Sequence, residues 1–374
     1  PGAPAPPPTT RSPRTTPSGR PHTPTTAPST PAADMRILVT GATGNLGPFV
    51  IQALRHDGHE VRALVRESSD RAWLNANRVE SIEGDILQPD SLGAAVDGMA
   101  AVIHLAGLHD SWAPQSQDFF ELNVDGACNV RDAARAAGVH RLVFVSSGST
   151  IGEEEDKVGT EDTERRDYAL SDYERSKVEA EAALLEDGSP LDVVIVNPAT
   201  VYGPGDASGT GQALIGALSG RLGVSVDVPV AWVYVKDVAS GIASALVRGR
   251  PGERYILASH NLSRLAFLQR AVELADLEYQ IKPASPLAWQ AFGLIYSLPA
   301  WIKRQRPVIS RAAVQIALHG SQLDGSKAER DLGLNYTPLD DGLNATLDWL
   351  HEAELVDLPE EGDDEPDDEP AERS

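Results

Sequence analysis

Cysteine and long hydrophobic runs are scarce in this 374-residue chain. The single Cys128 excludes an intrachain disulfide and a zinc site built from cysteines, which favours a reducing compartment, so we expect the cytoplasm. No apolar run reaches the roughly 18–20 residues of a membrane-spanning helix, and no signal peptide is recognisable. Acidic residues outnumber basic ones, 55 to 32, giving a formal net charge of -23. Nucleic acids and anionic membrane surfaces are therefore not expected as partners.

The two ends of the chain have compositions that cannot build a core. Residues 1–34 are rich in Pro, Thr, Ser and Ala and are predicted to be disordered. Met35 stands just before the first predicted strand and could be the natural start. Residues 353–374 carry an acidic run and are predicted to form a disordered, solvated tail. We therefore expect the chemistry to lie between these ends.

A glycine-rich stretch at residues 35–47 organises the rest of the chain. Residues 37–39 form an apolar run typical of a buried strand, Gly41, Gly44 and Gly47 follow at intervals of three, and residues 49–54 have helical spacing. Such a turn lets backbone N–H groups and the positive end of a helix face a pyrophosphate. An ordinary glycine turn is the alternative, but the flanking strand and helix favour a dinucleotide site.

Strands and helices then alternate along the chain. Repeated βα units with apolar strands predict an α/β fold with a doubly wound parallel sheet covered by helices on both faces. The predicted strands are 37–39, 60–66, 79–85, 101–107, 141–147 and 191–197, and the main helices are 91–96, 123–137 and 171–185. Ligands bind at the carboxyl ends of such strands, so one crevice should be lined by Gly41, Asp85, Leu105–Gly107, Ser147 and Asn197.

The pattern loosens after Asn197. We assign residues 35–200 to a dinucleotide-binding domain, to which residues 231–258 return with a last strand near 255–258. Residues 201–230 and 259–352 are assigned to a smaller, mostly helical substrate-binding lobe. Within it, residues 287–302 are apolar and aromatic, too short to span a bilayer, and are interpreted as a core or substrate-facing helix, with membrane-surface contact as the alternative.

The spacing of Tyr173 and Lys177 suits proton transfer. The two residues are four apart at the start of an amphipathic helix and so lie on one face. An ammonium group near a phenol favours the phenolate and lowers the pKa of the tyrosine, which would make it a usable acid or base near neutral pH. A lone pair of this kind is usually a surface pair on a helix. Here it follows a dinucleotide turn and Ser146-Ser147 at a predicted strand end.

With these motifs in place, the chain resembles the extended short-chain dehydrogenase/reductase family over roughly residues 35–350. Within that family it looks most like the dihydroflavonol-reductase-like and hopanoid-associated sugar-epimerase-like branches, a likeness carried by segments 112–114 and 251–257. The family motifs, in order, are Thr40–Gly47, Gly84-Asp85, His104–Gly107, Asn123–Gly126, Val145–Ser147, Tyr173-x-x-x-Lys177, Asn197–Gly205 and Val235–Val238.

The resemblance implies a Rossmann-type domain and a role for each matching residue. Tyr173 would exchange the proton with a substrate oxygen, Ser147 would hydrogen-bond that oxygen, and Lys177 would hold the ribose hydroxyls and keep Tyr173 acidic. A homodimer paired through helices near 126–137 and 171–185 is also implied. The implied cofactor-binding residues are Gly41, Thr43, Gly44, Asn45, Leu46, Gly47, Arg66, Asp85, Ile86, Leu105, Ala106, Gly107, Tyr173, Lys177, Asn197 and Pro198.

The end of the second strand decides between NADP and NAD. A carboxylate there would bind the ribose 2′-OH of NAD, whereas an arginine would accommodate the 2′-phosphate of NADP. Arg66 ends this strand, while Arg62 points to the same side but lies deeper. Glu67 is adjacent and keeps NAD as the alternative. We therefore predict NADP as the preferred cofactor.

The predicted function is an NAD(P)-dependent oxidoreductase that acts on a hydroxyl or carbonyl group of a small substrate, sugar-nucleotide-like or other. A nucleotide-sugar epimerase with tightly bound NAD is the first alternative. Dehydratases of this family usually carry an acidic pair beside the serine, and Ser147-Gly148-Ser149 lacks it. A non-catalytic dinucleotide-binding sensor or assembly factor is the second alternative, although such proteins commonly lose the Tyr or Lys.

The remaining candidates have more ordinary interpretations. His104 in a buried strand is expected to be a hydrogen-bonded core residue, and His109 and Trp112 either face the substrate or are merely structural. Asp237 is expected to cap the helix that follows it. Asn123 is expected to be a helix cap or a structural residue rather than a catalyst. No histidine and carboxylate cluster has metal-ligand spacing, so no metal is expected.

Overall fold

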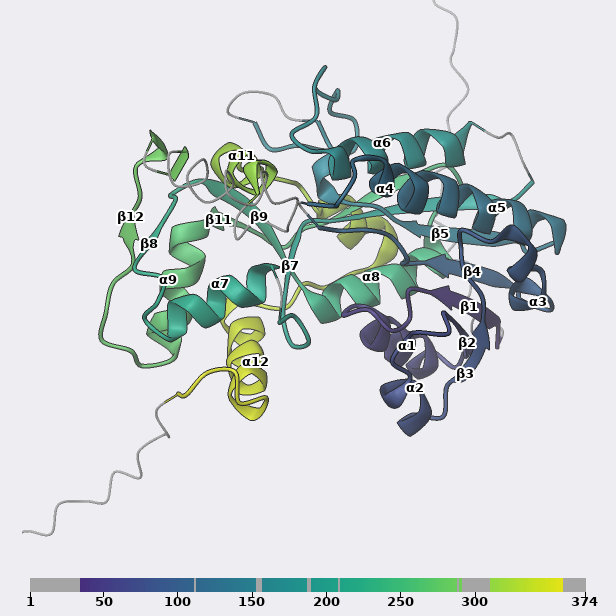
Figure 1. The fold of residues 1–374 in the computed structure, drawn as a ribbon, viewed down its shortest axis with the longest axis horizontal. Coiled ribbons are helices and arrows are strands. Elements are labelled where there is room, and N and C mark those ends of the chain that lie inside the picture. Colours follow the sequence, from purple (N-terminus) through teal and green to yellow (C-terminus); the bar gives the residue numbers. More distant parts are fainter. Residues whose placement is uncertain are drawn as a thin grey trace, which may run out of the picture. The chain divides into compact units, whose positions relative to one another are not determined.

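A seven-stranded, fully parallel sheet forms the centre of the larger part of the molecule (Figure 1). The computed structural model describes residues 34–110, 112–152, 157–186, 190–207, 209–287, 289–290 and 310–358. The strand order of the seven-stranded sheet is β10-β6-β5-β4-β1-β2-β3. The strands are β1 Arg36–Thr40, β2 Glu60–Val65, β3 Glu80–Glu83, β4 Ala101–His104, β5 Arg141–Val145, β6 Asp192–Pro198 and β10 Arg254–Leu257. The predicted doubly wound sheet is confirmed.

Helices cover both faces of this sheet, as Figure 1 shows. Alternate strand residues enter two separate cores because side chains of a strand point to opposite faces. On one face lie α1 (Gly47–His56), α2 (Ala72–Ala76) and α8 (Val235–Arg248). The other face carries α3 (Gly93–Val96), α5 (Gly126–Ala136) and α6 (Asp172–Leu185), with α4 (Gln117–Phe120) next to α6. In α1, the apolar residues Val50, Ile51 and Leu54 fall on one side and are fully buried.

The strand order reverses between β1 and β4, which places the loops after these two strands side by side. β1 pairs with β2 on one side and with β4 on the other, and Thr40 stands opposite His104. In open α/β sheets, ligands bind in the crevice at such a switch point. The loop that starts at Gly41 and the one that starts at Leu105 therefore face each other.

A smaller lobe has its own sheets and its own core. β11 pairs antiparallel and β7 parallel with the central β9, and β8 pairs with β12. Trp232 of β9 stacks on Phe267 of α9 with 3.8 Å between ring centroids. The elements are β7 Thr200–Tyr202, β8 Val224–Ser225, β9 Pro229–Tyr234, β11 His260–Ser263, β12 Lys282–Pro283, α7 Gly209–Leu218, α9 Arg264–Leu274, α11 Arg311–His319 and α12 Leu339–Glu352.

The boundary between the two parts is less simple than the one expected from the sequence. Within residues 231–258, β9 is a strand of the small sheet. In contrast, β10 is a strand of the large sheet, and α8 packs on one face of that sheet. The turn Ala328–Leu332 packs against the core of the large sheet. Val356 is 7% exposed and packs in the small lobe, so the packed chain continues past residue 352. Residues 1–33, 291–309 and 359–374 lie outside the described residues, and the predictions made for them remain predictions.

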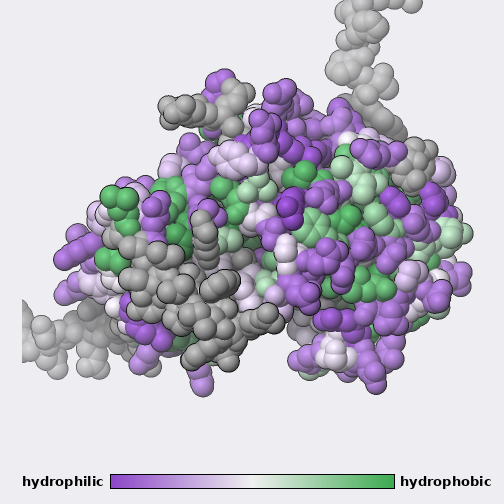
Figure 2. All heavy atoms as spheres, turned by 45° about the horizontal axis from the view of Figure 1, so that its top comes forward, coloured by the Kyte–Doolittle hydropathy of each residue, from purple (hydrophilic) through white to green (hydrophobic). Residues whose placement is uncertain are grey.

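Polar side chains predominate on the face of the molecule that Figure 2 shows, with smaller hydrophobic areas between them. This agrees with the excess of acidic over basic residues. Within the described ranges, no helix combines the length and the apolar character needed to cross a bilayer.

Candidate active site

The glycine turn between β1 and α1 brings backbone close to the neighbouring loop. Gly41 has a φ of 70°, and a Cβ at this position would stand 2.6 Å from the backbone nitrogen of Ala106. A Cβ on Gly47 would collide with the carbonyl group of Ala42. Only glycine fits at these two positions. The first turn of α1 has no acidic residue and no side-chain cap, so no negative side chain opposes the positive end of its helix dipole. Of its N–H groups, that of Gly47 donates to the carbonyl of Gly44, and Pro48 has none.

A cavity of about 730 Å³ lies at the carboxyl ends of the parallel strands. Most of the predicted site residues line it, and they come from seven different segments. Gly47 and Asn197 do not, because Gly47 packs on Ala42 and Asn197 is fully buried behind Ser147. The predicted residues that line the cavity are Gly41, Thr43, Gly44, Asn45, Leu46, Arg66, Asp85, Ile86, Leu105, Ala106, Gly107, Ser147, Tyr173, Lys177 and Pro198.

The two arginines of β2 and its following loop have different environments. Arg66 is exposed at the cavity, and its backbone N–H donates to Ser69 Oγ, which also lines the cavity. Arg62 donates to Glu80 Oε1 at 2.7 Å and to three backbone carbonyls in the 94–97 turn. Arg62 is therefore held by the protein, whereas Arg66 is placed to meet a ligand.

Asp85 and Ile86 follow β3 at the same end of the cavity. Asp85 Oδ1 accepts a hydrogen bond from the N–H of Leu87, which shapes the loop. Ile86 is buried and contacts Gly126 at the start of α5, where a Cβ would stand 2.7 Å from Ile86 Cδ1. These two residues line the same cavity as the glycine turn.

Ser147, Tyr173 and Lys177 meet at the other end of the cavity. Ser171 caps α6 by accepting from the N–H of Glu174, which fixes the helix just before Tyr173. Lys177 is 5% exposed, and its ammonium group donates to the carbonyl of Val145 at 2.8 Å. Tyr173 packs against Phe119 and is hydrogen-bonded to the side chain of Ser147. The predicted triad is therefore brought together.

Burial governs the protonation of this triad. It raises the pKa of the Tyr173 phenol, a shift that the hydrogen bond with Ser147 opposes and the charge of Glu181 reinforces. The expected lowering by Lys177 is therefore not seen. Burial lowers the pKa of Lys177 to about 8, against the influence of Glu181, which raises it. At neutral pH the phenol is thus protonated and most of the lysine is charged.

Asn123 has a structural role, but it does not cap a helix. It lies in the π-helical turn Glu121–Asp125, where it is 1% exposed. Its side chain accepts from the N–H of Leu108 at 2.7 Å, donates to the carbonyl of Leu108 and donates to Ser176 Oγ of α6. A Cβ on Gly107 would stand 2.7 Å from Asn123 Oδ1. Asn123 therefore ties the loop after β4 to the helix of the tyrosine.

The other candidates lie where ordinary packing puts them. His104 is fully buried, bonds to Thr40 Oγ1 at 2.7 Å, and is kept neutral because burial lowers its pKa to about 3. His109 lines the cavity, but Trp112 does not. Asp237 accepts from both the N–H and the hydroxyl of Thr337, so it anchors the chain before α12 instead of capping α8.

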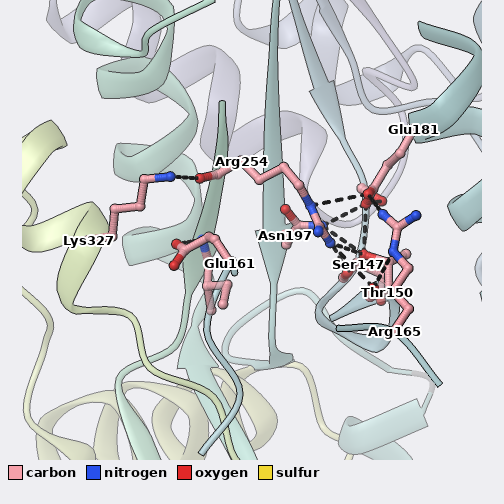
Figure 3. A network of polar contacts seen from close by, with 10 residues as sticks. Ser147, Thr150, Glu161, Arg165, Glu181, Asn197, Arg254 and Lys327 are labelled. Atoms are coloured by element: carbon pink, nitrogen blue, oxygen red, sulfur yellow. Dashed lines mark hydrogen bonds and ion pairs between the residues drawn. The ribbon is translucent and has the colours of Figure 1, made fainter. Parts of the chain in front are cut away.

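One cluster of the site was missed at the level of sequence. Glu181 of α6 lies behind Ser147 and binds side chains from several segments (Figure 3). Its partners include Arg165 from the loop before α6 and Arg254 from β10. Glu181 follows Lys177 by four residues and Tyr173 by eight, which places all three on one helix face. That spacing was the available signal, but the partners are distant in sequence.

The residues present fit a nicotinamide dinucleotide. The cradle at Gly41 and Gly107 leaves no space for a Cβ, and the start of α1 carries the positive end of a helix dipole. Lys177 and Arg66 line the cavity and supply positive charge. Within the described residues, no group of three or more His, Cys, Asp or Glu side chains is arranged to hold a metal ion.

Comparisons with known proteins agree with this geometry. Residues 37–258 match the model of the NAD-dependent epimerase/dehydratase family. The chain is 30% identical to sterol demethylase protein B of Methylococcus capsulatus over 86% of this chain and all of that protein. It is 29% identical to a putative dihydroflavonol 4-reductase of Synechocystis, over 84% and 94%. A nucleoside-diphosphate-sugar epimerase from Pseudomonas aeruginosa has a similar structure, with a TM-score of 0.71 and 26% identity over 87% and 100%.

Proposed function

Since the chain belongs to the NAD-dependent epimerase/dehydratase family, the extended type of short-chain dehydrogenase/reductase, we propose that it transfers hydride at a hydroxyl or carbonyl carbon with Tyr173 as acid and base. The observation that carries the proposal is the meeting of Ser147, Tyr173 and Lys177 at one wall of the cavity whose far end is the glycine turn. The family and the curated relatives are enzymes, which argues against a non-catalytic sensor.

Each residue of the triad has a task that follows from its environment. The phenol of Tyr173 lines the cavity with its pKa raised, so it is protonated at neutral pH and suited to donate a proton to a carbonyl oxygen, which favours the reductive direction. Ser147 would hydrogen-bond the same oxygen and fix its position. The Lys177 ammonium group donates one N–H to the carbonyl of Val145, and its other two N–H groups can donate to ribose hydroxyls. The bound nicotinamide supplies the hydride exchange itself.

We further propose that NADP is preferred over NAD. The family is NAD-binding, and the finer choice rests on Arg66 and Ser69, which stand together at the adenosine end of the cavity. A guanidinium group and a hydroxyl suit a 2′-phosphate. Glu67 is exposed and is not among the lining residues. Titration with NADPH and NADH tests this choice, and equal or tighter binding of NADH contradicts it.

For the substrate, we propose a largely apolar alcohol or ketone. Among the described residues that line the cavity, the Lys and Arg side chains are Arg66 and Lys177, both assigned to the cofactor. A nucleotide sugar would bring a second diphosphate that needs its own cations. Leu108, Val201 and Val235 are among the apolar residues that line the cavity. The names of two relatives, a sterol demethylase protein and a dihydroflavonol reductase, point to compounds of this kind.

The function is tested by following reduced nicotinamide in the presence of a 3β-hydroxysterol or a dihydroflavonol. The wild-type chain should turn over at least one of these probes, and Tyr173→Phe should lose about 10²–10⁴-fold in kcat while it still binds the cofactor. Turnover that survives in Tyr173→Phe would contradict the role of the tyrosine. Turnover of a nucleotide sugar, with neither probe accepted, would redirect the proposal to an epimerase.

A further inference from the structure

Glu181 is a buried carboxylate on the helix that carries Tyr173 and Lys177. It is fully buried and does not line the cavity, so it cannot touch the substrate or the cofactor. A buried charge is costly unless it is paired and hydrogen-bonded. The contacts of its two oxygens therefore show what the charge does.

The Oε1 atom of Glu181 holds the turn that contains Ser147. It accepts from Ser146 Oγ at 2.5 Å, from Thr150 Oγ1 at 2.7 Å and from Asn197 Nδ2 at 2.8 Å. The last two groups also lie at 2.9 and 3.1 Å from the carbonyl oxygen of Ser147. One oxygen atom thus joins the end of β5, the 3₁₀ turn Gly148–Thr150 and β6 to helix α6.

The Oε2 atom binds two guanidinium groups. Arg165 Nη2 lies at 2.5 Å and Arg254 Nε at 3.3 Å (Figure 3). Both arginines also reach the carbonyl of Thr150, at 3.0 and 3.3 Å. These ion pairs offset part of the cost of burying the carboxylate. The same contacts close the back of the serine turn.

We propose that Glu181 is a positioning residue for the reaction, which holds Ser147 in register with Tyr173 and keeps a negative charge behind the Tyr173–Lys177 pair. The proposal rests on the function proposed above. Its geometric basis is that one side chain connects the helix of the acid with the turn of the serine. Asn123 performs a comparable task on the opposite side of α6, where it bonds Ser176 and Leu108.

Among the charged and titratable groups around Tyr173 and Lys177, Glu181 is the one whose negative charge acts on both. Its charge raises the pKa of both Tyr173 and Lys177. From β4, His104 faces Lys177 and is neutral. From the neighbouring loop and β10, Arg165 and Arg254 face Glu181, with Glu161 beyond Arg254. Other charged groups on or against α6 bond elsewhere: Asp172 to Ser116, Glu174 to Arg166, Arg175 to Asp172 and Arg131 to the carbonyl of Ala183.

The test that needs no substrate is a lysine titration by NMR. The chain has six lysines, so ¹³C-labelled lysine gives few signals, and Lys177→Met identifies the one from Lys177. In the wild type its midpoint should lie near pH 8. In Glu181→Gln the midpoint should fall by about 0.5–1 pH unit, because the charge that favours the ammonium form is gone. A residue that only packs would have the opposite effect, since loosening would hydrate Lys177 and raise its midpoint.

The positioning part is tested by turnover. Glu181→Gln should lower kcat roughly tenfold to a hundredfold and leave cofactor affinity unchanged. Thr150→Val keeps the charge but removes the hydroxyl shared by Glu181 and Ser147, so it should lower kcat without moving the Lys177 midpoint. Glu179→Gln on the exposed side of α6 is the matched control and should leave both quantities at wild-type values.

The outcomes are separable. A Lys177 midpoint that is unchanged or higher in Glu181→Gln overturns the electrostatic part, and wild-type kcat in Thr150→Val overturns the positioning part. If Glu181→Gln does not fold, Glu181→Gln combined with Arg165→Gln removes one opposing charge and carries the same titration. If Tyr173→Phe stays active, the proposed function fails. The lysine titration still decides whether the charge of Glu181 raises the pKa of Lys177.

Discussion

The two ends of the cavity are built in different ways. At the adenosine end, the backbone of the glycine turn and the exposed side chains of Arg66 and Ser69 offer separate contacts. At the reaction end, Tyr173 and Lys177 are tied into a buried network with Ser147, Glu181 and their partners. The first end is a set of independent contacts, whereas the second is one connected structure.

This difference predicts how substitutions combine. Changes at distant, unconnected sites usually add in free energy, whereas changes within one hydrogen-bond network do not. Substitutions at the adenosine end should alter binding alone. Substitutions at the reaction end should alter proton transfer, pH dependence and stability together. Three measurements test this contrast.

The largest expected effect at the adenosine end is that of Gly41→Ala. The new Cβ would stand 2.6 Å from the backbone of Ala106 in a conformation with positive φ, so the loop after β4 must shift. We expect unfolding stability to fall by about 1–3 kcal/mol and cofactor affinity to fall at least about tenfold. Denaturant unfolding and a fluorescence titration with NADPH measure the two effects.

Gly138→Ala is the matched control for that substitution. Gly138 has a φ of 72°, close to that of Gly41, but a Cβ there meets nothing within 4 Å. The strain of an alanine at positive φ should therefore lower the free energy of unfolding by about 1 kcal/mol, while cofactor affinity stays at the wild-type value. Equal losses of affinity in both variants would show that the glycine turn does not act through its close approach to Ala106.

A smaller effect is expected from Arg66→Ala. If Arg66 meets the 2′-phosphate, its removal should weaken NADPH roughly tenfold and leave NADH unchanged, because one charge-assisted contact is lost. Arg62→Ala, four residues earlier in β2, should affect stability and not the choice of cofactor. It breaks contacts to Glu80 and to backbone carbonyls, so it should lower stability without changing the NADPH/NADH affinity ratio. An unchanged ratio in Arg66→Ala would remove the basis for NADP.

The same contrast explains what the sequence could predict. The glycine turn, the strand ends and the pair Tyr173 and Lys177 are local patterns, and the structure brings them to one cavity. The parallel sheet follows from repeated apolar strands, and its edge strand β10 was expected as a last strand near residues 255–258. Spacing along the sequence is enough to predict those parts of the site that backbone geometry determines.

Long-range partners were beyond this reasoning. Arg165 and Arg254 reach Glu181 from segments 16 and 73 positions away, and no local spacing links either arginine to Glu181. The direction of the Tyr173 pKa was also wrong at that stage, because helix spacing gave the neighbour of the phenol but not its burial. Asn123 was assigned as a cap or structural residue, yet its contacts to Leu108 and Ser176 depend on the folded loop.

The last effect we predict is a pH dependence of stability at the reaction end. The pKa of Lys177 is about 8 in the folded chain, below the 10.5 of an ordinary lysine, because the ammonium group is buried. Between these values the unfolded chain binds more protons than the folded one, so stability should rise with pH. Relative to Lys177→Met, the wild type should gain about 1–3 kcal/mol in unfolding free energy between about pH 8 and pH 10. Urea unfolding of both variants across this range measures the gain. Parallel curves would mean that Lys177 is hydrated in the folded state, and the two ends of the cavity would then be less different than the buried network indicates.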